Sequence, residues 1–362
     1  MNPRDEPRER CRLALELAGA AGAEGLLVSD PFNLRWLSGF TGGEALLLFG
    51  GKRRLLLADS RYTAQAQAEA PDFEVILYTR RPEEVAAWAV KLSLRRLAFE
   101  PEGLTHGRFL ELRRAARRTK LIPLAGTLKS LRARKSAAEV RSIARAARIA
   151  REALEECLPR LRPGMREREF AALLEMKMRE RGSGPAPFET IVASGPRGAL
   201  PHGSASERRM KKGELVTIDF GAIDGGYQSD QTVTVALGRP RPELARIYEV
   251  VREAQSRALR LIRPGAVCKE VDAAARDYIR DRGFGDYFGH GLGHGVGLET
   301  HEEPVLNIRS ETALAAGMVV TVEPGIYLPG LGGVRIEDMA LVTVRGCRRL
   351  TRSGGPLREI ML

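Results

Sequence analysis

The sequence predicts an α/β (α+β) protein of two domains, and three observations support this prediction. The chain of 362 residues exceeds the length of about 250–300 residues at which one hydrophobic core stops growing. Its first third alternates strand-like and helix-like segments, as in a mixed sheet with helices on its faces. The rest repeats an arrangement of two helices followed by a hairpin. We therefore expect domains at residues 1–132 and 133–362.

The strands of the first domain are expected where short apolar runs are bounded by glycine, proline or charged residues. These runs lie at residues 24–29, 45–49, 54–58, 73–78 and 96–100. Gly50-Gly51 is the expected turn between the second and third strands. Helical patterns cover residues 60–70 and 82–94. The order of these elements predicts a mixed sheet rather than a purely antiparallel one.

A long helix is expected to open the second domain. Ser136 and Glu139 have the spacing of a capping box, in which each side chain accepts a hydrogen bond from the backbone of the other residue. From Val140 to Leu158, apolar residues recur every three or four positions, which gives an α-helix one apolar face. Pro163-Gly164 is expected to end this helix.

The second domain also contains an internal repeat with a constant offset of 101 residues and no gap. Each copy is a helix, a Pro-Gly break and a second helix, followed by glycine-rich sequence and a hairpin that carries carboxylates. The matching segments are Glu152-Ala153 with Glu253-Ala254, Arg162-Pro-Gly164 with Arg263-Pro-Gly265, and Arg179-Glu-Arg-Gly182 with Arg280-Asp-Arg-Gly283. The repeat predicts a pseudo-two-fold domain whose halves each bring one hairpin to a shared centre.

The first of these hairpins carries Asp219 and Asp230. Asp224-Gly225 favours a two-residue type I′ turn, and this turn places Asp219 directly opposite Asp230. Their Cβ atoms would then lie about 4.5–5.5 Å apart on one face. Two like charges at that distance repel each other unless a positive charge lies between them. A divalent cation would supply this charge; the alternative is a solvated, exposed hairpin face.

The second hairpin carries Glu323 and Glu337, which face each other across a loop centred on Gly330. The flanking segments, residues 318–322 and 340–344, are apolar and rich in β-branched residues, as buried strands are. Charged residues at the ends of buried strands need partners. This second pair therefore also indicates a cation site.

A glycine-rich run at residues 289–302 lies between the hairpins and contains His290, His294 and His301. His202 lies in another glycine-rich stretch of the same domain. A lone histidine is more often structural than catalytic, but three within twelve residues beside two carboxylate pairs favour a functional role. Four carboxylates and one histidine are enough ligands for two metal ions.

Composition excludes several other classes of protein. No run approaches the ~18 apolar residues of a membrane helix, and the charged N-terminus is unlike a signal peptide, so we expect a cytoplasmic protein that binds no membrane. The net charge is +12, but the basic residues are mixed with acidic ones and accompany no nucleic-acid motif. We therefore expect no nucleic-acid partner. The four cysteines are widely spaced and form neither a zinc knuckle nor a disulfide framework.

Together these motifs resemble the proline-peptidase branch of the pita-bread metallopeptidases, peptidase family M24, which includes Xaa-Pro aminopeptidase (aminopeptidase P) and prolidase. The family pattern is Asp, eleven residues later Asp, then His in a glycine-rich run, Glu before Pro-Gly, and Glu in Arg-Ile-Glu-Asp. All five residues are present, as Asp219, Asp230, His294, Glu323 and Glu337. The segments Asn33–Gly42 and Asp59–Tyr62 resemble the family's creatinase/prolidase-like N-terminal domain. The resemblance covers almost the whole chain.

The resemblance implies a role for each ligand. Asp219 would chelate one ion, and His294 and Glu323 would bind the other. Asp230 and Glu337 would bridge both ions, and the two ions would hold a bridging hydroxide between them. Oxygen-rich ligation with a single imidazole favours Mn²⁺, with Co²⁺ possible in vitro.

The remaining site residues are also assigned by resemblance. His202 and His301 match histidines that contact the substrate and stabilise the tetrahedral intermediate. His290 and Arg335 line the site, and we expect Arg335 to hydrogen-bond a ligand carboxylate. Glu323 is the candidate proton shuttle. Two departures from the family pattern remove no ligand: residues 232–234 read Thr-Val-Thr rather than Thr-Arg-Thr, and Thr300 replaces an Ile or Val.

The resemblance implies an exopeptidase that acts on peptides with proline at the second position. The first expectation is a metallo-aminopeptidase that cleaves the Xaa-Pro bond at peptide N-termini, and the alternative is an Xaa-Pro dipeptidase. Methionine aminopeptidase activity and a creatinase-type amidinohydrolase fit less well, because the first typically lacks the N-terminal domain and the second lacks this ligand set. An inactive pita-bread binding module is the alternative from a different class. A homodimer is expected by resemblance alone.

Overall fold

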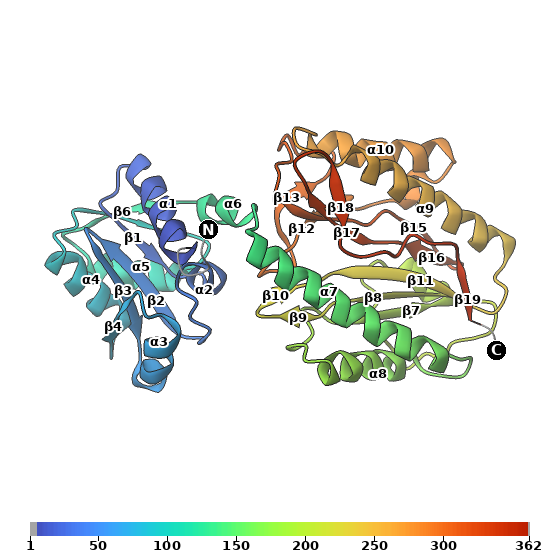
Figure 1. Ribbon diagram of the computed structural model, residues 1–362, viewed down its shortest axis with the longest axis horizontal. Helices are drawn as coiled ribbons and strands as arrows, with labels where there is room; N and C mark the ends of the chain where they lie inside the picture. The colour runs from blue at the N-terminus through green and yellow to red at the C-terminus, as the bar shows by residue number, and fades with distance from the viewer. Residues whose placement is uncertain (1–5, 361–362) are drawn as a thin grey trace. The chain divides into compact units, whose positions relative to one another are not determined.

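The computed structural model describes residues 6–360, and its helices and strands are labelled in Figure 1. The chain separates into two compact units, Met1–Leu131 and Arg132–Leu362. This division lies one residue before the boundary expected from the sequence. Among the residues described, no helix combines the length and apolar character needed to cross a membrane.

The N-terminal unit is built on a six-stranded sheet of order β4-β3-β2-β1-β5-β6. The β1–β2 and β2–β3 pairs are antiparallel, whereas β3–β4, β1–β5 and β5–β6 are parallel, so the predicted mixed sheet is confirmed. The strands are β1 (Gly25–Val28), β2 (Ala45–Gly50), β3 (Arg53–Ala58), β4 (Glu74–Leu77), β5 (Arg96–Phe99) and β6 (Lys120–Pro123). All but β6 were expected.

The helices of this unit cover both faces of that sheet. The expected helices are present as α3 (Thr63–Glu69), which follows the 3₁₀ turn η1 (Ser60–Tyr62), and as α4 (Arg81–Lys91). The sequence analysis did not predict α1 (Glu6–Ala20), α2 (Pro31–Ser38) or α5 (His106–Ala115). The patterns of α1 and α5 are dominated by charged residues and alanine, which gives a weak amphipathic signal.

The C-terminal unit consists of two similar halves, in which helices lie outside two central sheets (Figure 1). The helices of the first half are α7 (Ala137–Cys157) and α8 (Glu167–Glu180), and those of the second are α9 (Pro242–Leu261) and α10 (Cys268–Asp281). The repeat is therefore confirmed: α8 and α10 begin and end at the offset of 101. The capping box of α7 is also confirmed, with Glu139 N donating to Ser136 Oγ at 3.3 Å and Ser136 N donating to Glu139 Oε2 at 2.7 Å.

Each half has its own sheet. The order is β19-β11-β8-β7 in the first half and β13-β12-β14-β17-β18 in the second. The first-half strands are β7 (Ile191–Ser194), β8 (Leu215–Phe220), β11 (Gln231–Leu237) and β19 (Arg358–Ile360). The second-half strands are β12 (Gly293–Gly295), β13 (Glu302–Leu306), β14 (Val319–Val322), β17 (Asp338–Val342) and β18 (Cys347–Arg349).

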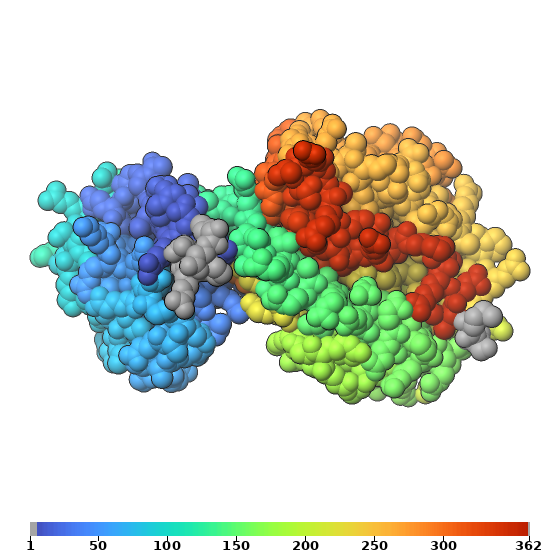
Figure 2. Space-filling view, in the orientation of Figure 1, coloured from blue at the N-terminus to red at the C-terminus, as the bar shows by residue number. Residues whose placement is uncertain are grey.

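Short elements complete the unit. Two small hairpins are β9 (Ile223–Asp224) with β10 (Tyr227–Gln228) and β15 (Gly325–Leu328) with β16 (Gly332–Arg335). Three 3₁₀ turns are η2 (Leu158–Arg160), η3 (Gly195–Ala199) and η4 (Gly285–Tyr287), and α6 (Thr127–Arg132) precedes α7. The last segment of the chain, red in Figure 2, runs over the surface of this unit from β18 in the second-half sheet to β19 in the first-half sheet, and so joins the two halves.

The register predicted for the first hairpin is wrong by two residues. Strands β8 and β11 pair so that Asp219 lies opposite Thr232 rather than Asp230. The chain reverses at Gly225-Gly226, with φ of +57° and +87°, and not at Asp224-Gly225. Both dipeptides suit a type I′ turn, and two glycines accept positive φ more readily than Asp does. Because side chains alternate with a period of two, Asp219 and Asp230 still share a face.

The register predicted for the second hairpin is confirmed. Gly325 pairs with Arg335 in one ladder and Val322 pairs with Asp338 in the next, so the register between them places Glu323 opposite Glu337. The connection turns at Gly330, whose φ is +79°.

Candidate metal centre

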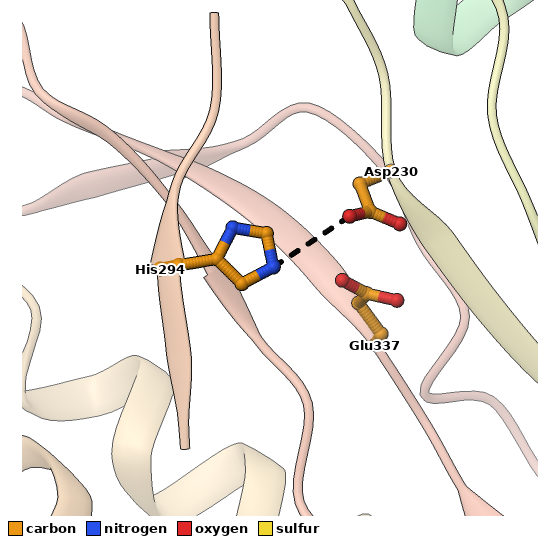
Figure 3. A group of neighbouring side chains, drawn as sticks. All are labelled: Asp230, His294 and Glu337. Carbon is orange, nitrogen blue, oxygen red and sulfur yellow. Dashed lines mark ion pairs between the residues drawn. The ribbon is translucent and has the colours of Figure 1, made fainter. Parts of the chain in front are cut away.

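Three predicted ligands from different strands converge at the centre of the C-terminal unit (Figure 3). Asp230 directly precedes β11, His294 lies in β12 and Glu337 directly precedes β17. One ligand atom from each lies within 4.8 Å of the others, and all three residues are buried. His294 Nε2 is 3.6 Å from Asp230 Oδ2. Residues from the two repeats thus form one cluster.

The other two predicted ligands lie beside this cluster. Glu323 follows β14, and its Oε1 is 3.2 Å from His294 Nε2. Thr321 joins the two residues, because its Oγ1 donates to Glu323 Oε1 at 3.2 Å and accepts from His294 N at 3.0 Å. Asp219 lies in β8, where its Oδ2 accepts a hydrogen bond from Arg335 Nη2 at 2.7 Å.

The protonation equilibria of the cluster show an excess of buried negative charge. Burial raises the pKa of Asp230 and Glu337 well above the ordinary value, and the neighbouring carboxylates raise it further. Burial also raises the pKa of Asp219, although Arg335 opposes this. Burial lowers the pKa of His294, but the hydrogen bond and charge of Glu323 outweigh that effect and raise it overall. Without a bound metal ion, the protonated imidazole of His294 therefore supplies positive charge beside these carboxylates.

The arrangement of polar atoms fits divalent cations. Asp219 Oδ1 and Glu337 Oε1 are buried and accept no hydrogen bond from the residues described, and buried polar atoms normally have partners. His294 Nδ1 lies 3.0 Å from the carbonyl of Gly295. Once Nε2 has given up its proton, donation from Nδ1–H to that carbonyl leaves the lone pair of Nε2 facing the carboxylates, which is the tautomer a metal ligand needs.

Arg335 donates hydrogen bonds to groups that hold the carboxylates in place. It is buried, and its Nε donates to Thr232 Oγ1 at 3.1 Å while Nη2 donates to Asp219. Thr232 Oγ1 in turn donates to Glu337 Oε2 at 2.7 Å. Nη1 donates to the carbonyl of Pro201 and to Tyr327 Oη, both at 3.0 Å. The predicted bond from Arg335 to a ligand carboxylate is thus present, and its other N–H groups face protein acceptors rather than open space.

The three remaining predicted histidines lie around the cluster. The ring of His301 is 4.1 Å from that of His294, centroid to centroid, and His301 is exposed. His202 is exposed on the loop after η3, close enough that its charge lowers the pKa of His301, after the larger effects of partial burial and His294. His290 is half-buried, and burial lowers its pKa. The structure therefore places the ring of His301 against that of His294, whereas the ring of His290 lies against that of Tyr327.

Tyr327 is a residue that the sequence analysis missed. Its Oη lies 2.9 Å from His290 Nε2 and accepts from Arg335 Nη1, so it connects His290 to the residues that hold Asp219. Tyr327 lies in the inserted hairpin β15–β16, which carries no motif in the single sequence. Only the placement of that hairpin against η4 and β8 identifies the tyrosine.

Two buried acids outside the cluster hold histidine-bearing loops. Asp272 on α10 is fully buried and pairs with Arg276, whose Nη2 donates to the carbonyl of His290 at 2.6 Å. Glu167 on α8 is also fully buried, and it accepts from Ser194 N at 2.8 Å and from Ser206 Oγ at 2.6 Å. These two serines flank the loop that carries His202. Both acids lie in helical patterns that gave no sign of this role.

The fold and the site together define a two-domain metallopeptidase of the pita-bread type. A family model described as metallopeptidase family M24 matches residues 141–344, and one described as the creatinase/prolidase N-terminal domain matches residues 10–134. The chain belongs to metallopeptidase family M24, as its motifs predicted.

Several solved structures and related sequences are similar to this protein over nearly the whole chain. A structure described as an Xaa-Pro dipeptidase from Bacillus anthracis is 41% identical with a TM-score of 0.95, covering 98% of this chain and 100% of that one. A structure described as an X-Pro aminopeptidase from Thermotoga maritima is 37% identical with a TM-score of 0.89, covering 97% and 99%. An Xaa-Pro dipeptidase of Pyrococcus furiosus is 36% identical over 96% of this chain and 98% of its own length.

Proposed function

We propose that this protein is an Xaa-Pro dipeptidase, which hydrolyses the bond between a residue and a following C-terminal proline. The observation that carries the hydrolase proposal is the buried convergence of Asp230, His294 and Glu337 from two repeats. The names of the relatives from Bacillus anthracis and Pyrococcus furiosus favour the dipeptidase over the aminopeptidase that the motifs first suggested.

Five residues would hold two divalent ions, for which we propose Mn²⁺ because oxygen ligands predominate. They are Asp219, Asp230, His294, Glu323 and Glu337. When bound, the ions would lower the pKa of water and polarise the scissile carbonyl. The buried, mutually repelling carboxylates support this assignment.

The chain's own groups would move the protons and hold the substrate. The pKa of Glu323 is lowered, because the hydrogen bond and charge of His294 outweigh the opposing effect of burial. Glu323 is therefore ionised and able to accept a proton from water and pass it to the leaving proline nitrogen. The exposed imidazoles of His301 and His202 would donate hydrogen bonds to the carbonyl oxygen as charge develops on it.

A substrate panel tests the proposal. Xaa-Pro dipeptides, Xaa-Pro-Xaa tripeptides and Met-Ala-Ser should be assayed with manganese and with cobalt. We expect the dipeptides to be cleaved with the highest kcat/KM. Faster cleavage of the tripeptides would favour an Xaa-Pro aminopeptidase, which the Thermotoga maritima relative supports. Efficient cleavage of Met-Ala-Ser would contradict both.

Metal analysis separates an enzyme from an inactive binding module. After loading with manganese and removal of free ions, we expect about two ions per chain. Fewer than about one ion per chain would favour a binding module.

We also propose a homodimer. Light scattering should therefore give twice the chain mass of 39.7 kDa.

A further inference from the structure

His301 is an exposed side chain placed against a buried site. The centroid of its ring lies 4.1 Å from that of the His294 ring, with the two planes tilted at 50°, and it makes no side-chain hydrogen bond with the residues described. An exposed imidazole without such a bond can rotate and move with its loop. Its position must therefore come from the backbone of residues 297–302.

That backbone is held by the neighbouring residue, Glu302, which is buried although His301 is exposed. Glu302 Oε1 accepts hydrogen bonds from Leu298 N at 3.0 Å and from Glu299 N at 3.1 Å. A Cβ at Gly297 would lie 2.5 Å from Glu302 Oε2, so the carboxylate packs directly on the chain there. The side chain thus closes the loop onto itself just before His301.

Two cations fix this carboxylate from outside the loop. Lys135 Nζ lies 2.9 Å from Glu302 Oε2, and Arg132 Nη2 lies 3.1 Å from Glu302 Oε1. Arg132 also pairs with Glu299. The side chains of Lys135, Arg132 and Glu302 are each no more than 2% exposed. Burial raises the pKa of Glu302, but Lys135 and Arg132 outweigh this and lower it overall, so the ion pairs persist at neutral pH.

The backbone around Lys135 is itself anchored. Lys135 N donates to the carbonyl of Gly317 at 2.8 Å, and Arg134 bridges to Met318, which leads into β14. On the other side of the loop, Gln228 from β10 donates to the carbonyl of Leu298 at 2.7 Å and accepts from Thr300 Oγ1 at 2.5 Å. The loop is therefore fixed from both halves of the unit, and Lys135 is the buried charge that holds its end.

We propose that Glu302, held by Lys135 and Arg132, is a positioning residue that sets where His301 stands over the metal centre. The catalytic consequence rests on the proposed function. A buried ion pair is a poor source of net stability, because desolvation of two charges offsets their attraction. Geometry therefore explains its presence better than stability does, since a displacement of about 1 Å at a catalytic group can cost about 100-fold in rate.

The test variant is Lys135→Met, which keeps the length of the stem, removes the charge and leaves Arg132 to pair with Glu302. The matched control is Lys177→Met, because Lys177 also pairs with glutamates, Glu156 and Glu180, but lies on α8 away from His301. We expect Lys135→Met to lower kcat about tenfold or more, with a much smaller change in KM, because His301 would act on the transition state. Lys177→Met should change neither.

Imidazole NMR signals give a second readout that does not depend on activity. The chain has only five histidines, so each ring signal can be assigned by substitution, and His106 on α5 serves as an internal reference. In metal-free protein, Lys135→Met should shift and broaden the His301 signal but not the His106 signal. An unchanged His301 signal together with an unchanged kcat would overturn the proposal.

Two further outcomes are separable. If the parent protein cleaves no Xaa-Pro peptide, the proposed function fails, and the His301 signal alone decides the positioning role. If Lys135→Met does not fold, the double variant Lys135→Met/Glu302→Gln replaces it, because it leaves no lone buried charge. The His301 signal should still shift in that variant, and an unshifted signal would contradict the proposal.

Discussion

The two halves of the C-terminal unit share one architecture but contribute different side chains to the candidate metal centre. The first half supplies Asp219 and Asp230, and the second supplies His294, Glu323 and Glu337. At the offset of 101 residues, the position of His294 in β12 corresponds to Ala193 in β7. The repeat therefore fixes where strands meet, whereas single substitutions on those strands decide which atoms face the centre.

The halves also differ in how their hairpins turn. The first turns at Gly225-Gly226, and its strands pair two residues away from the expected register. The second contains an inserted hairpin but keeps the expected register. An insertion thus need not change a register when the loop is symmetric about one glycine. Two adjacent glycines, in contrast, can move a turn by one residue from an Asp-Gly pair, because both accept positive φ.

The largest effect should follow from removing a carboxylate from either half. Asp230→Ala and Glu337→Ala each delete a proposed shared ligand, so kcat should fall at least about 10³-fold, the equivalent of several kcal/mol of transition-state stabilisation. Steady-state kinetics measure this loss, and circular dichroism should show that the fold is retained. Full activity in Asp230→Ala would refute the proposed sharing of that ligand between the halves.

Manganese should stabilise the parent protein by about 2.7 kcal/mol at a free concentration 100 times its Kd. Asp230→Asn should lose most of this gain but be more stable than the parent when both are metal-free. Folding raises the pKa of the Asp230 carboxyl. Such a group contributes less to the stability of the folded state as the pH rises through its folded pKa. Its replacement by asparagine should therefore stabilise the metal-free folded state at pH values above that pKa.

Thermal unfolding at neutral pH, with manganese or with chelator, measures both effects. Gln228→Asn, in the same hairpin but outside the ligand set, should lose hydrogen bonds to Leu298 and Thr300 but keep the gain from manganese, so it separates a change in the hairpin from the loss of a ligand. If the metal-free Asp230→Asn protein melts at a lower temperature than the metal-free parent, the charge of Asp230 does not destabilise the folded state.

The hairpin register can be tested with Gly226→Ala. In the observed turn Gly226 has φ of +87°, so an alanine there should cost about 1 kcal/mol. In the register expected from the sequence, Gly226 would be an ordinary paired residue, and the same change would cost almost nothing. Denaturant unfolding distinguishes the two, and Gly330→Ala, at φ +79° in the second hairpin, should show a cost similar to that of the observed turn.

The smallest effect concerns the helices that open the halves. Ser136 caps α7 through its side chain, whereas Arg241 at the start of α9 makes no side-chain cap. Ser136→Ala should therefore lower the free energy of unfolding by about 1 kcal/mol, and Arg241→Ser should raise it by about 0.5 kcal/mol. The two substitutions should therefore change the free energy of unfolding in opposite directions. If Arg241→Ser lowers it as Ser136→Ala does, the missing side-chain cap of α9 does not limit the stability of the second half.

Much of the fold and the five predicted ligands could be inferred from the chain itself. Strand runs such as residues 45–49, the capping box at Ser136 and the repeat are local or periodic signals, and local energetics express them directly. Acidic and imidazole side chains in a fixed order beside glycine predict a metal site, because these side chains are metal ligands. The missed helix α1 lacks such a signal because alanine and charged residues dominate it.

The residues that support the site could not be inferred in this way. Lys135 and Arg132 lie in a basic stretch that marked a domain boundary, and nothing local distinguishes them from solvated cations. Their role depends on burial against Glu302, some 167 positions away. Tyr327, Asp272 and Arg276 likewise gain meaning only from contacts between distant segments.

The sequence by itself determined the domain classes, the repeat and the ligand types, because these follow from periodicity, turn chemistry and side-chain chemistry. The tertiary structure alone decided the register of the first hairpin, the burial that raises the pKa of Asp230 and Glu337, and the ion pairs around Glu302. These depend on desolvation and on distances across the chain, which no short stretch of residues specifies.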